Sequence, residues 1–267
     1  MPDFVSVSVW GEYACFTRPE LKVERMSYPV MTPSAARGVL DAILWRPQMR
    51  WHVRRIAILK PFADYGGPPY QLANIRRNEI QDKVPARSVS AWMKDSDSVT
   101  PYFVDSAGRA GVQGENRTQR NTLLLRDVRY RIDATPILTG LANKPRQRPP
   151  NEDEEPGADS VAKYVSMFNR RVSKGQCFHR PYLGCREFAA DFAPPSDEEQ
   201  PVEWTEDLGP KLYDVRHLDD GRRVPGFFLA RVNDGVLHCD TRAKGPNGEP
   251  PVRVMGWSDE EIEGAAS

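Results

Sequence analysis

Alternating apolar and polar residues open the chain and predict a β-strand over residues 4–10. A basic loop follows, and then a helix is predicted from Thr32 to about Trp45. Thr32 can cap the free amides of the first turn, Pro33 suits the first helical position, and Pro47 disfavours helical geometry before it. A strand, a basic loop and a helix that packs back on the strand are typical of the start of a ferredoxin-like or RNA-recognition-motif unit.

The rest of the chain shows further strands, one more helix and polar stretches between them. The second helix is predicted from Asp159–Ser160 to about Lys174, with an apolar stripe at helical spacing. Strands are predicted over residues 51–61, 122–138, 185–192, 211–218, 226–232 and 236–240. A loop is predicted over residues 62–72, a solvated linker over 143–158 and a second, polar linker over 194–201. Part of the polar stretch 73–122 is expected to need a partner for its order.

This order of elements predicts an α+β fold with two domains. Residues 1–193 are expected to form a ferredoxin-like (RNA-recognition-motif) N-terminal domain with a long basic insertion. Residues 202–258 are expected to form a small antiparallel β-sheet C-terminal domain, since Asp-Gly and Asn-Asp-Gly turns join its strands. Residues 259–267 are expected to be an acidic tail.

Charge changes this picture, because the net charge of zero over 267 residues hides two opposite halves. Residues 1–150 hold 23 Lys and Arg against 14 Asp and Glu, and residues 151–267 hold 14 against 23. The basic half, in which Arg outnumbers Lys, predicts a surface for nucleic acid, since guanidinium groups bind phosphates and stack on bases. The alternative is that the two halves attract each other.

Several classes of protein are excluded by what the sequence lacks. It has no apolar run of membrane-spanning length and no signal segment, so a cytoplasmic protein without a membrane partner is predicted. The four cysteines form no C-x-x-C pair, and Cys177, His179 and Cys185 have no common zinc spacing. P-loop and dinucleotide-binding motifs are also absent from the sequence, and no metal and no cofactor are predicted.

RNA cleavage needs none of these groups, because RNA carries its own nucleophile, the 2′-hydroxyl. A protein has only to align that oxygen with the phosphate, move two protons and neutralise the developing charge. Lys163 and Tyr164, at the start of the second predicted helix, are the best candidates. The alternative is that Tyr164 belongs to the core, since it sits in the apolar stripe, and that Lys163 is a solvated lysine.

Six segments carry a resemblance to a known family, and they follow one another over about the first 190 residues. They are Tyr13–Glu20, Lys22–Arg25, Pro33–Gly38, Arg76–Glu79, Gln119–Leu124 and Leu183–Phe188. With these segments the chain resembles the subtype I-C branch of the fifth-numbered CRISPR-associated protein family, which processes CRISPR repeat RNA. A shared order of six motifs is far more specific than any one of them.

The resemblance also implies where cleavage takes place. In the family, a Lys-His pair at the start of the second helix and an aromatic residue before Trp-Lys-Pro at the end of the first helix form the site. The matching positions here are Lys163, Tyr164 and Leu44, so the lysine is kept, the histidine is a tyrosine and the aromatic residue is absent. Unperturbed tyrosine has a pKa of about 10, roughly three units above a useful base. We therefore expect Lys163 to stabilise charge, and Tyr164, Tyr28 or His52 to handle the protons.

Basic residues of the same segments are the predicted RNA contacts. They are Arg18, Lys22, Arg25, Arg37, Arg76, Arg77, Arg120 and Arg186. Gly184-Cys185-Arg186 resembles the family's glycine-containing loop near the RNA path. The alternatives are a solvated surface for each arginine, a packing role for Arg37 and an ordinary turn at Gly184.

The function that the resemblance implies is a metal-independent endoribonuclease that cuts CRISPR repeat RNA (pre-crRNA) at the base of its hairpin by 2′-hydroxyl attack. It also implies a 2′,3′-cyclic phosphate product, and a protein that stays on the 5′ handle of the guide with the backbone and large subunits of the surveillance complex. Two alternatives stay open: a non-catalytic crRNA-capping subunit, and a module that binds duplex DNA.

Overall fold

The computed structural model describes residues 3–21, 23–59, 70–80, 85–99, 117–143, 159–218, 221–243 and 252–258. Its strands are β1 (Val5–Ala14), β2 (Arg25–Met26), β3 (Met49–Ile58), β4 (Gln71–Ile80), β5 (Arg117–Leu138), β6 (Asp191–Ala193), β7 (Glu206–His217), β8 (Arg223–Asn233) and β9 (Val236–His238). Its helices are α1 (Pro33–Ile43), α2 (Ala86–Lys94) and α3 (Val161–Ser173), with short 3-10 turns η1 (Ser96–Ser98) and η2 (Gly140–Asn143). The fold is α+β, as predicted.

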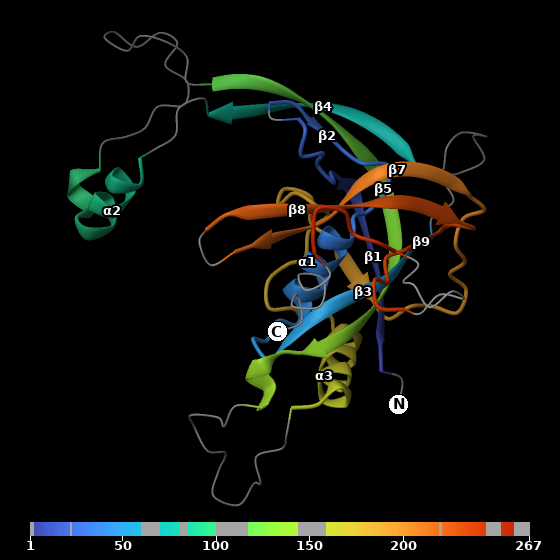
Figure 1. Cartoon of the computed structure of the whole chain (residues 1–267). Coiled ribbons are helices and arrows are strands. Elements are labelled where there is room, and N and C mark those ends of the chain that lie inside the picture. Colours follow the sequence, from blue (N-terminus) through green and yellow to red (C-terminus); the bar gives the residue numbers. More distant parts are fainter. Residues whose placement is uncertain are drawn as a thin grey trace, which may run out of the picture.

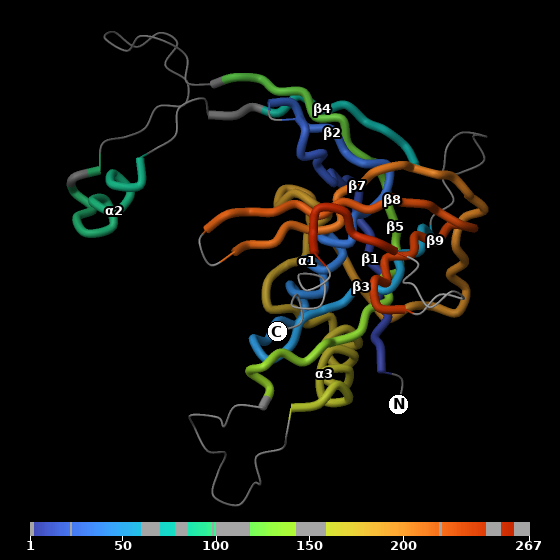
Figure 2. The backbone as a smooth tube through the Cα atoms, in the orientation of Figure 1, coloured from blue at the N-terminus to red at the C-terminus, as the bar shows by residue number. Residues whose placement is uncertain are grey.

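One sheet of nine strands runs through the described part of the chain, in the order β6-β1-β5-β3-β9-β8-β7, with β2 and β4 also paired to β5. The 22-residue strand β5 is its centre, since its first half pairs with β4 and its second half with β1 and β3. All of these pairs are antiparallel except the short pair of β2 with β5. Figure 2 shows β4 and the first half of β5 running side by side away from the rest of the chain.

Helices α1 and α3 contact each other, and α3 packs on the strands β1, β5 and β6. Helix α1 contacts β3 and also β7, so the sheet curls around this helix (Figure 1). The apolar sides of α1 and α3 are buried, with Leu40, Ile43 and Phe168 fully inside the main core. The curl brings the C-terminal strands to the end of a helix that lies far from them in sequence.

The helix boundaries follow the predicted signals. The hydroxyl of Thr32 accepts a hydrogen bond from the amide of Ala35, and that of Ser160 accepts one from the amide of Lys163. Helix α1 ends two residues before the predicted boundary. Its last carbonyls find partners in side chains, since Arg171 Nη1 donates to the Ile43 oxygen at 2.5 Å and Trp51 Nε1 to the Leu44 oxygen at 2.8 Å.

One prediction about local structure was wrong. Residues 185–192 do not form a strand, because Gly184 has a φ of +84° and starts a turn that leaves only β6 at the end of that range. Residues 194–201 form no helix or strand and are mostly exposed, as predicted for a polar linker, and Glu199 within them pairs with Arg129. The polar stretch 73–122 contains two strand segments that were not predicted, β4 and the start of β5, which pair through backbone hydrogen bonds that polar side chains do not prevent. That part of this stretch needs a partner for its order stays a prediction.

The strands after residue 202 join the same sheet, because β9 pairs with β3. The division into domains 1–193 and 202–258 stays a prediction. Most of the predicted linker 143–158, the acidic tail and Lys22 lie outside the described residues. Within the described ranges, no helix has the length and apolar character needed to cross a membrane.

Candidate RNA-processing site

Lys163 and Tyr164 lie in the first turn of α3, as predicted, but in different surroundings. The Lys163 side chain is 31% exposed, and its Nζ donates a hydrogen bond to Asp159 Oδ1 at 2.7 Å. The Tyr164 side chain is buried in the main core, with 2% of the residue exposed. The ammonium group of Lys163 can therefore reach a ligand at the start of the helix, whereas the ring of Tyr164 packs against the main hydrophobic core.

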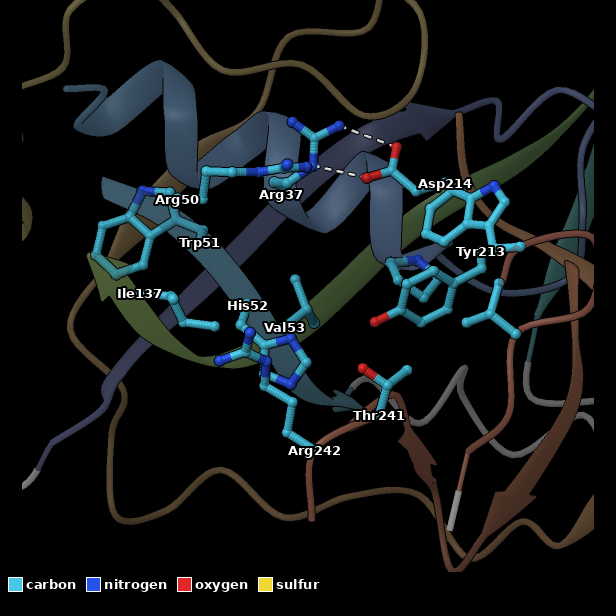
Figure 3. A pocket seen from close by; sticks show the side chains of 13 residues that line it. Arg37, Arg50, Trp51, His52, Val53, Ile137, Tyr213, Asp214, Thr241 and Arg242 are labelled. Carbon is cyan, nitrogen blue, oxygen red and sulfur yellow. Dashed lines mark hydrogen bonds and ion pairs between the residues drawn. The ribbon is translucent and has the colours of Figure 1, made fainter. Parts of the chain in front are cut away.

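His52 and Arg37 come together in one small pocket of about 60 Å³ (Figure 3). The pocket lies between α1, β3, β7 and the segment after β9. His52 Nε2 lies 2.9 Å from Asp240 Oδ1, and the side chain is 13% exposed. Burial alone would raise the pKa of Asp240, but its hydrogen bonds with His52 and with the amides of Arg242 and Ala243 hold that pKa well below its usual range. The carboxylate thus fixes the orientation of the imidazole ring.

Arg37 uses its donors inside the fold. Its Nε and Nη2 donate to the two carboxylate oxygens of Asp214 at 2.9 Å, as the dashed lines in Figure 3 show, and its Nη1 donates to Asp41 at 3.1 Å. Burial alone would lower the pKa of Arg37, but the two carboxylates hold it above its usual range. The ion pairs tie α1 to β7, which fits the packing role that the sequence left open.

A second cluster lies where β2 and β4 flank β5. Arg25 and Arg77 both reach Glu187 Oε1, at 2.7 and 3.3 Å, and Arg120 lies opposite Arg77 in the strand register. Arg76 and Arg186 are exposed near the same strands and loop. The structure therefore brings predicted RNA contacts from three distant segments to one surface.

Cys185 belongs to this second cluster. Its Sγ lies 3.5 Å from Arg25 Nη1 and 3.6 Å from the Thr17 hydroxyl. The hydrogen bond with Cys15, followed by those to Thr17 and the charge of Arg25, lowers the pKa of Cys185 to about 6 against the effect of burial. The predicted glycine loop is thus held against β2 by polar contacts.

Tyr28 and Arg18 form a third group. Tyr28 is 4% exposed, and both the Arg18 guanidinium and the Lys211 ammonium lie 5.4 Å from its ring centre. Burial, followed by the charge of Glu20, raises the pKa of Tyr28. Among the contacts of the described residues, none joins Lys163 to Tyr28 or to His52.

Many ion pairs cross between the basic and acidic halves of the chain, which supports the alternative that these halves attract each other. They include Arg25–Glu187, Arg77–Glu187, Arg37–Asp214, Arg129–Glu199 and Arg54–Asp240. Much of the positive charge of the first half is thus neutralised within the fold. Arginines that form no ion pair with a carboxylate are therefore the better candidates for contacts with RNA.

A larger groove of about 840 Å³ lies at the end of α1, and sequence reasoning missed it. Trp45, Arg50 and Arg216 line it, from the end of α1, the start of β3 and the end of β7. The Trp45-Arg46 dipeptide after the helix was visible in the sequence, but nothing local indicated that Arg216, from the acidic half, would join it. In the described parts of the chain, no three His, Cys, Asp or Glu side chains are placed to hold a metal ion.

Comparisons with known proteins identify the family of this chain. A family described as CRISPR-associated protein (Cas_Cas5), with the model name Cas_Cas5d, matches residues 4–256. A protein of Thermus thermophilus named CRISPR pre-crRNA endoribonuclease Cas5d is 40% identical over 250 residues, which cover 87% of this chain and 90% of that protein. A protein of the same name from Mannheimia succiniciproducens is 37% identical over 246 residues, which cover 89% and 95%.

Solved structures show the same fold. A crystal structure of a CRISPR-associated protein covers 94% of this chain and 96% of its own, with a TM-score of 0.54 and 20% identity. A functionally uncharacterized protein from Streptococcus mutans covers the same shares, with a TM-score of 0.52 and 17% identity. The resemblance predicted from the six sequence segments is confirmed, and the chain belongs to the Cas5d family of CRISPR-associated proteins.

Proposed function

We propose that this protein is an endoribonuclease that processes CRISPR repeat RNA. The observation that carries the proposal is the match to two relatives named CRISPR pre-crRNA endoribonuclease over 87% and 89% of the chain. The cluster around Arg25, Arg77 and Arg120, and the basic groove at the end of α1, supply surfaces for a folded RNA and its flanks.

In the proposed reaction the 2′-hydroxyl oxygen attacks the adjacent phosphorus atom, and the bond from phosphorus to the 5′ oxygen breaks. The products are a 2′,3′-cyclic phosphate and a 5′-hydroxyl. A base takes the proton of the attacking hydroxyl, and an acid gives one to the leaving oxygen. The ammonium group of Lys163, beside the free amides at the start of α3, stabilises the negative charge on the phosphoryl oxygens.

His52 is the proposed carrier of protons, because its ring is partly exposed and a carboxylate orients it. The burial of Tyr164 and Tyr28, and the raised pKa of Tyr28, make the two phenols weaker candidates for a base. His52 and Lys163 belong to separate groups of contacts, and the test below addresses Lys163.

The test is a single-turnover cleavage assay with the repeat RNA in EDTA. The wild type is expected to cut one phosphate, and a single 2′-deoxy substitution at that position should block the cut. Lys163→Ala should slow cleavage by about 10²- to 10³-fold, as expected for the loss of one charge-stabilising group. Lys174→Ala, an exposed lysine at the other end of α3, is the matched control. Equal rates for both variants would remove Lys163 from the mechanism.

A non-catalytic crRNA-capping subunit is the second candidate. It is favoured by the burial of Leu44 and Tyr164, the two positions at which this chain departs from the family's cleavage residues. Tight binding of repeat RNA without any product would support it. Equal affinity for an unrelated DNA duplex would instead support the duplex-binding alternative.

We infer a ferredoxin-like unit within residues 1–193 from the order β6-β1-β5-β3 with α1 and α3 as its helices. The strands of residues 202–258 would then be an addition to that unit. The backbone and large subunits of a surveillance complex as partners, the 5′ handle as the bound product and a cytoplasmic location remain parts of the proposal.

A further inference from the structure

Two cysteines from distant parts of the chain meet where the loop after Leu183 crosses the end of β1. The amide of Cys15 donates a hydrogen bond to the Leu183 oxygen at 3.0 Å, and Gly184 packs directly on the Cys15 carbonyl, where no side chain would fit. The Cys185 sulfur lies 3.5 Å from that carbonyl oxygen, and the two thiols share a hydrogen bond. Backbones in contact and thiols that face each other are what a disulfide requires.

The two thiols differ in exposure, which gives them different roles. Cys185 is half-buried in a turn whose neighbours Gly184 and Arg186 are exposed, so a small solute can reach its sulfur. Cys15 is fully buried, with 0% of the residue exposed. Cys185 is therefore the cysteine of this pair that a reagent from solution meets first, and Cys15 can react only with the product formed on Cys185.

The groups around Cys185 favour its thiolate. Its sulfur lies 3.5 Å from Arg25 Nη1 and 3.6 Å from the Thr17 hydroxyl. The hydrogen bond with Cys15 contributes most to the lowered pKa of Cys185, whereas burial and the charge of Glu187 oppose the shift. The same hydrogen bond, followed by burial, raises the pKa of Cys15. The negative charge therefore resides on the accessible sulfur and the proton on the buried one, and a thiolate beside a cation is the form of cysteine that peroxides oxidise.

We propose that Cys185 is a site of reversible oxidation by peroxides, and that Cys15 then closes a disulfide with it. In the first step the Cys185 sulfur attacks one oxygen of hydrogen peroxide. The S–O bond forms, the O–O bond breaks and hydroxide leaves, so the sulfur is oxidised to a sulfenic acid and the peroxide is reduced. In the second step the Cys15 sulfur attacks the Cys185 sulfur, the S–O bond breaks, and the thiol proton of Cys15 leaves with the hydroxyl group as water.

The disulfide would fix the loop that carries Glu187, the carboxylate that both Arg25 and Arg77 contact. A dithiol such as dithiothreitol would reverse it by thiol–disulfide exchange. The oxidation goes beyond the proposed function, because neither step involves RNA.

The experiment treats the reduced full-length protein with hydrogen peroxide, blocks the remaining thiols with N-ethylmaleimide and maps the peptides by mass spectrometry without reduction. A peptide pair linked through Cys15 and Cys185 is expected, and dithiothreitol should remove the link. The rate at which Cys185 loses its free thiol should be half-maximal near pH 6, where its thiolate becomes protonated. An ordinary thiol would reach half of its maximal rate only near about pH 8.5.

Three variants sharpen the test. Cys185→Ser should abolish the link and leave Cys15 as a free thiol. Cys15→Ala keeps the accessible thiol without its partner, so the sulfenic acid at Cys185 should accumulate and be trapped by dimedone. Cys177→Ser is the matched control, because it makes the same change at an exposed cysteine, and the link should form at the wild-type rate.

The wild-type peptide map decides the assignment even where a variant at the buried Cys15 does not fold. A map in which Cys177 is oxidised while Cys15 and Cys185 remain free thiols would overturn it. A link from Cys185 to Cys177, or a half-maximal rate of Cys185 oxidation near about pH 8.5, would overturn it as well. Each of these results leaves the proposed function intact, since that function is tested by the cleavage of repeat RNA.

Discussion

Asp214→Asn separates the stability of the fold from the binding of RNA, because the two are expected to change in opposite directions. The carboxylate accepts two hydrogen bonds from Arg37 at 2.9 Å, and the two side chains are 13% and 30% exposed. Breaking a fully buried pair costs about 3–5 kcal/mol, and breaking an exposed pair about 0–1 kcal/mol. For this partly buried pair, in which Asn keeps one acceptor and Asp41 remains, we expect a loss of about 2 kcal/mol. For a protein of this size, that lowers Tm by about 4 °C.

The affinity for RNA should rise in the same variant. Arg37 keeps only Asp41 as a charged partner, so the groove beside it gains one positive charge. One unit charge at a distance of several ångströms from a phosphate, in a medium close to water, is worth about 0.5 kcal/mol. The Kd for the flanked repeat RNA should therefore fall about twofold at low salt, and the gain should vanish at high salt.

The assay combines urea unfolding with fluorescence anisotropy. Asp191→Asn is the control, because Asp191 pairs with Arg180 at 2.5 Å while the two side chains are 59% and 64% exposed. It makes the same change of charge and should alter the stability by less than about 0.5 kcal/mol. If Asp214→Asn kept the wild-type stability and lost affinity for RNA, the ion pair would not hold α1 to β7, and the reasoning would be refuted.

The further predictions concern four single positions. Gly184→Ala should destabilise by about 3 kcal/mol or more in urea unfolding, because the added Cβ would lie 2.1 Å from the Cys15 carbonyl oxygen at a φ of +84°. Gly38→Ala, in α1 with open space around it, should instead stabilise by up to about 1 kcal/mol. Tyr164→Ala should cost about 3–5 kcal/mol, since the ring fills the core, whereas Tyr164→Phe keeps the ring and should cost about 1 kcal/mol. Asp240 has a folded-state pKa below the ordinary 3.8, so the stability that it contributes is present above pH 4 and is lost as the pH falls through the folded pKa. The difference in unfolding free energy between the wild type and Asp240→Asn should therefore shrink as the pH falls below about 4.

Each of these predictions has an outcome that contradicts it. Similar stabilities of the Gly184→Ala and Gly38→Ala variants would mean that the loop does not approach Cys15. A Tyr164→Phe variant that folds like the wild type but loses cleavage would give the hydroxyl a chemical role, against the assignment to the core. A stability difference at Asp240 that persists unchanged to pH 3 would show that the carboxylate is not held by its hydrogen bonds.

The features that the sequence alone determined are those that depend on local signals. Thr32 and Ser160 cap their helices as predicted, because a cap needs only the residue and the amides of the next turn. The turn at Asn233-Asp234-Gly235 is also as predicted, with positive φ values of 46° and 72° at its last two residues. The order of the six segments identified the family for the same reason, since it could be read along the chain without knowledge of any contact.

Contacts between distant segments determined the other features of the fold and of the candidate site. The strand β4 could not be predicted, because it is polar and is held by backbone hydrogen bonds to β5. Arg37 looked like a contact for RNA until the fold placed Asp214, 177 residues away, against it. Trp45, Arg50 and Arg216 form one groove only because the sheet curls around α1. The sequence determined which residue types and local turns are present, and the tertiary structure decided which charges are neutralised and which remain for a ligand. That division has a physical reason, since neutralisation depends on distances between segments that no local pattern encodes.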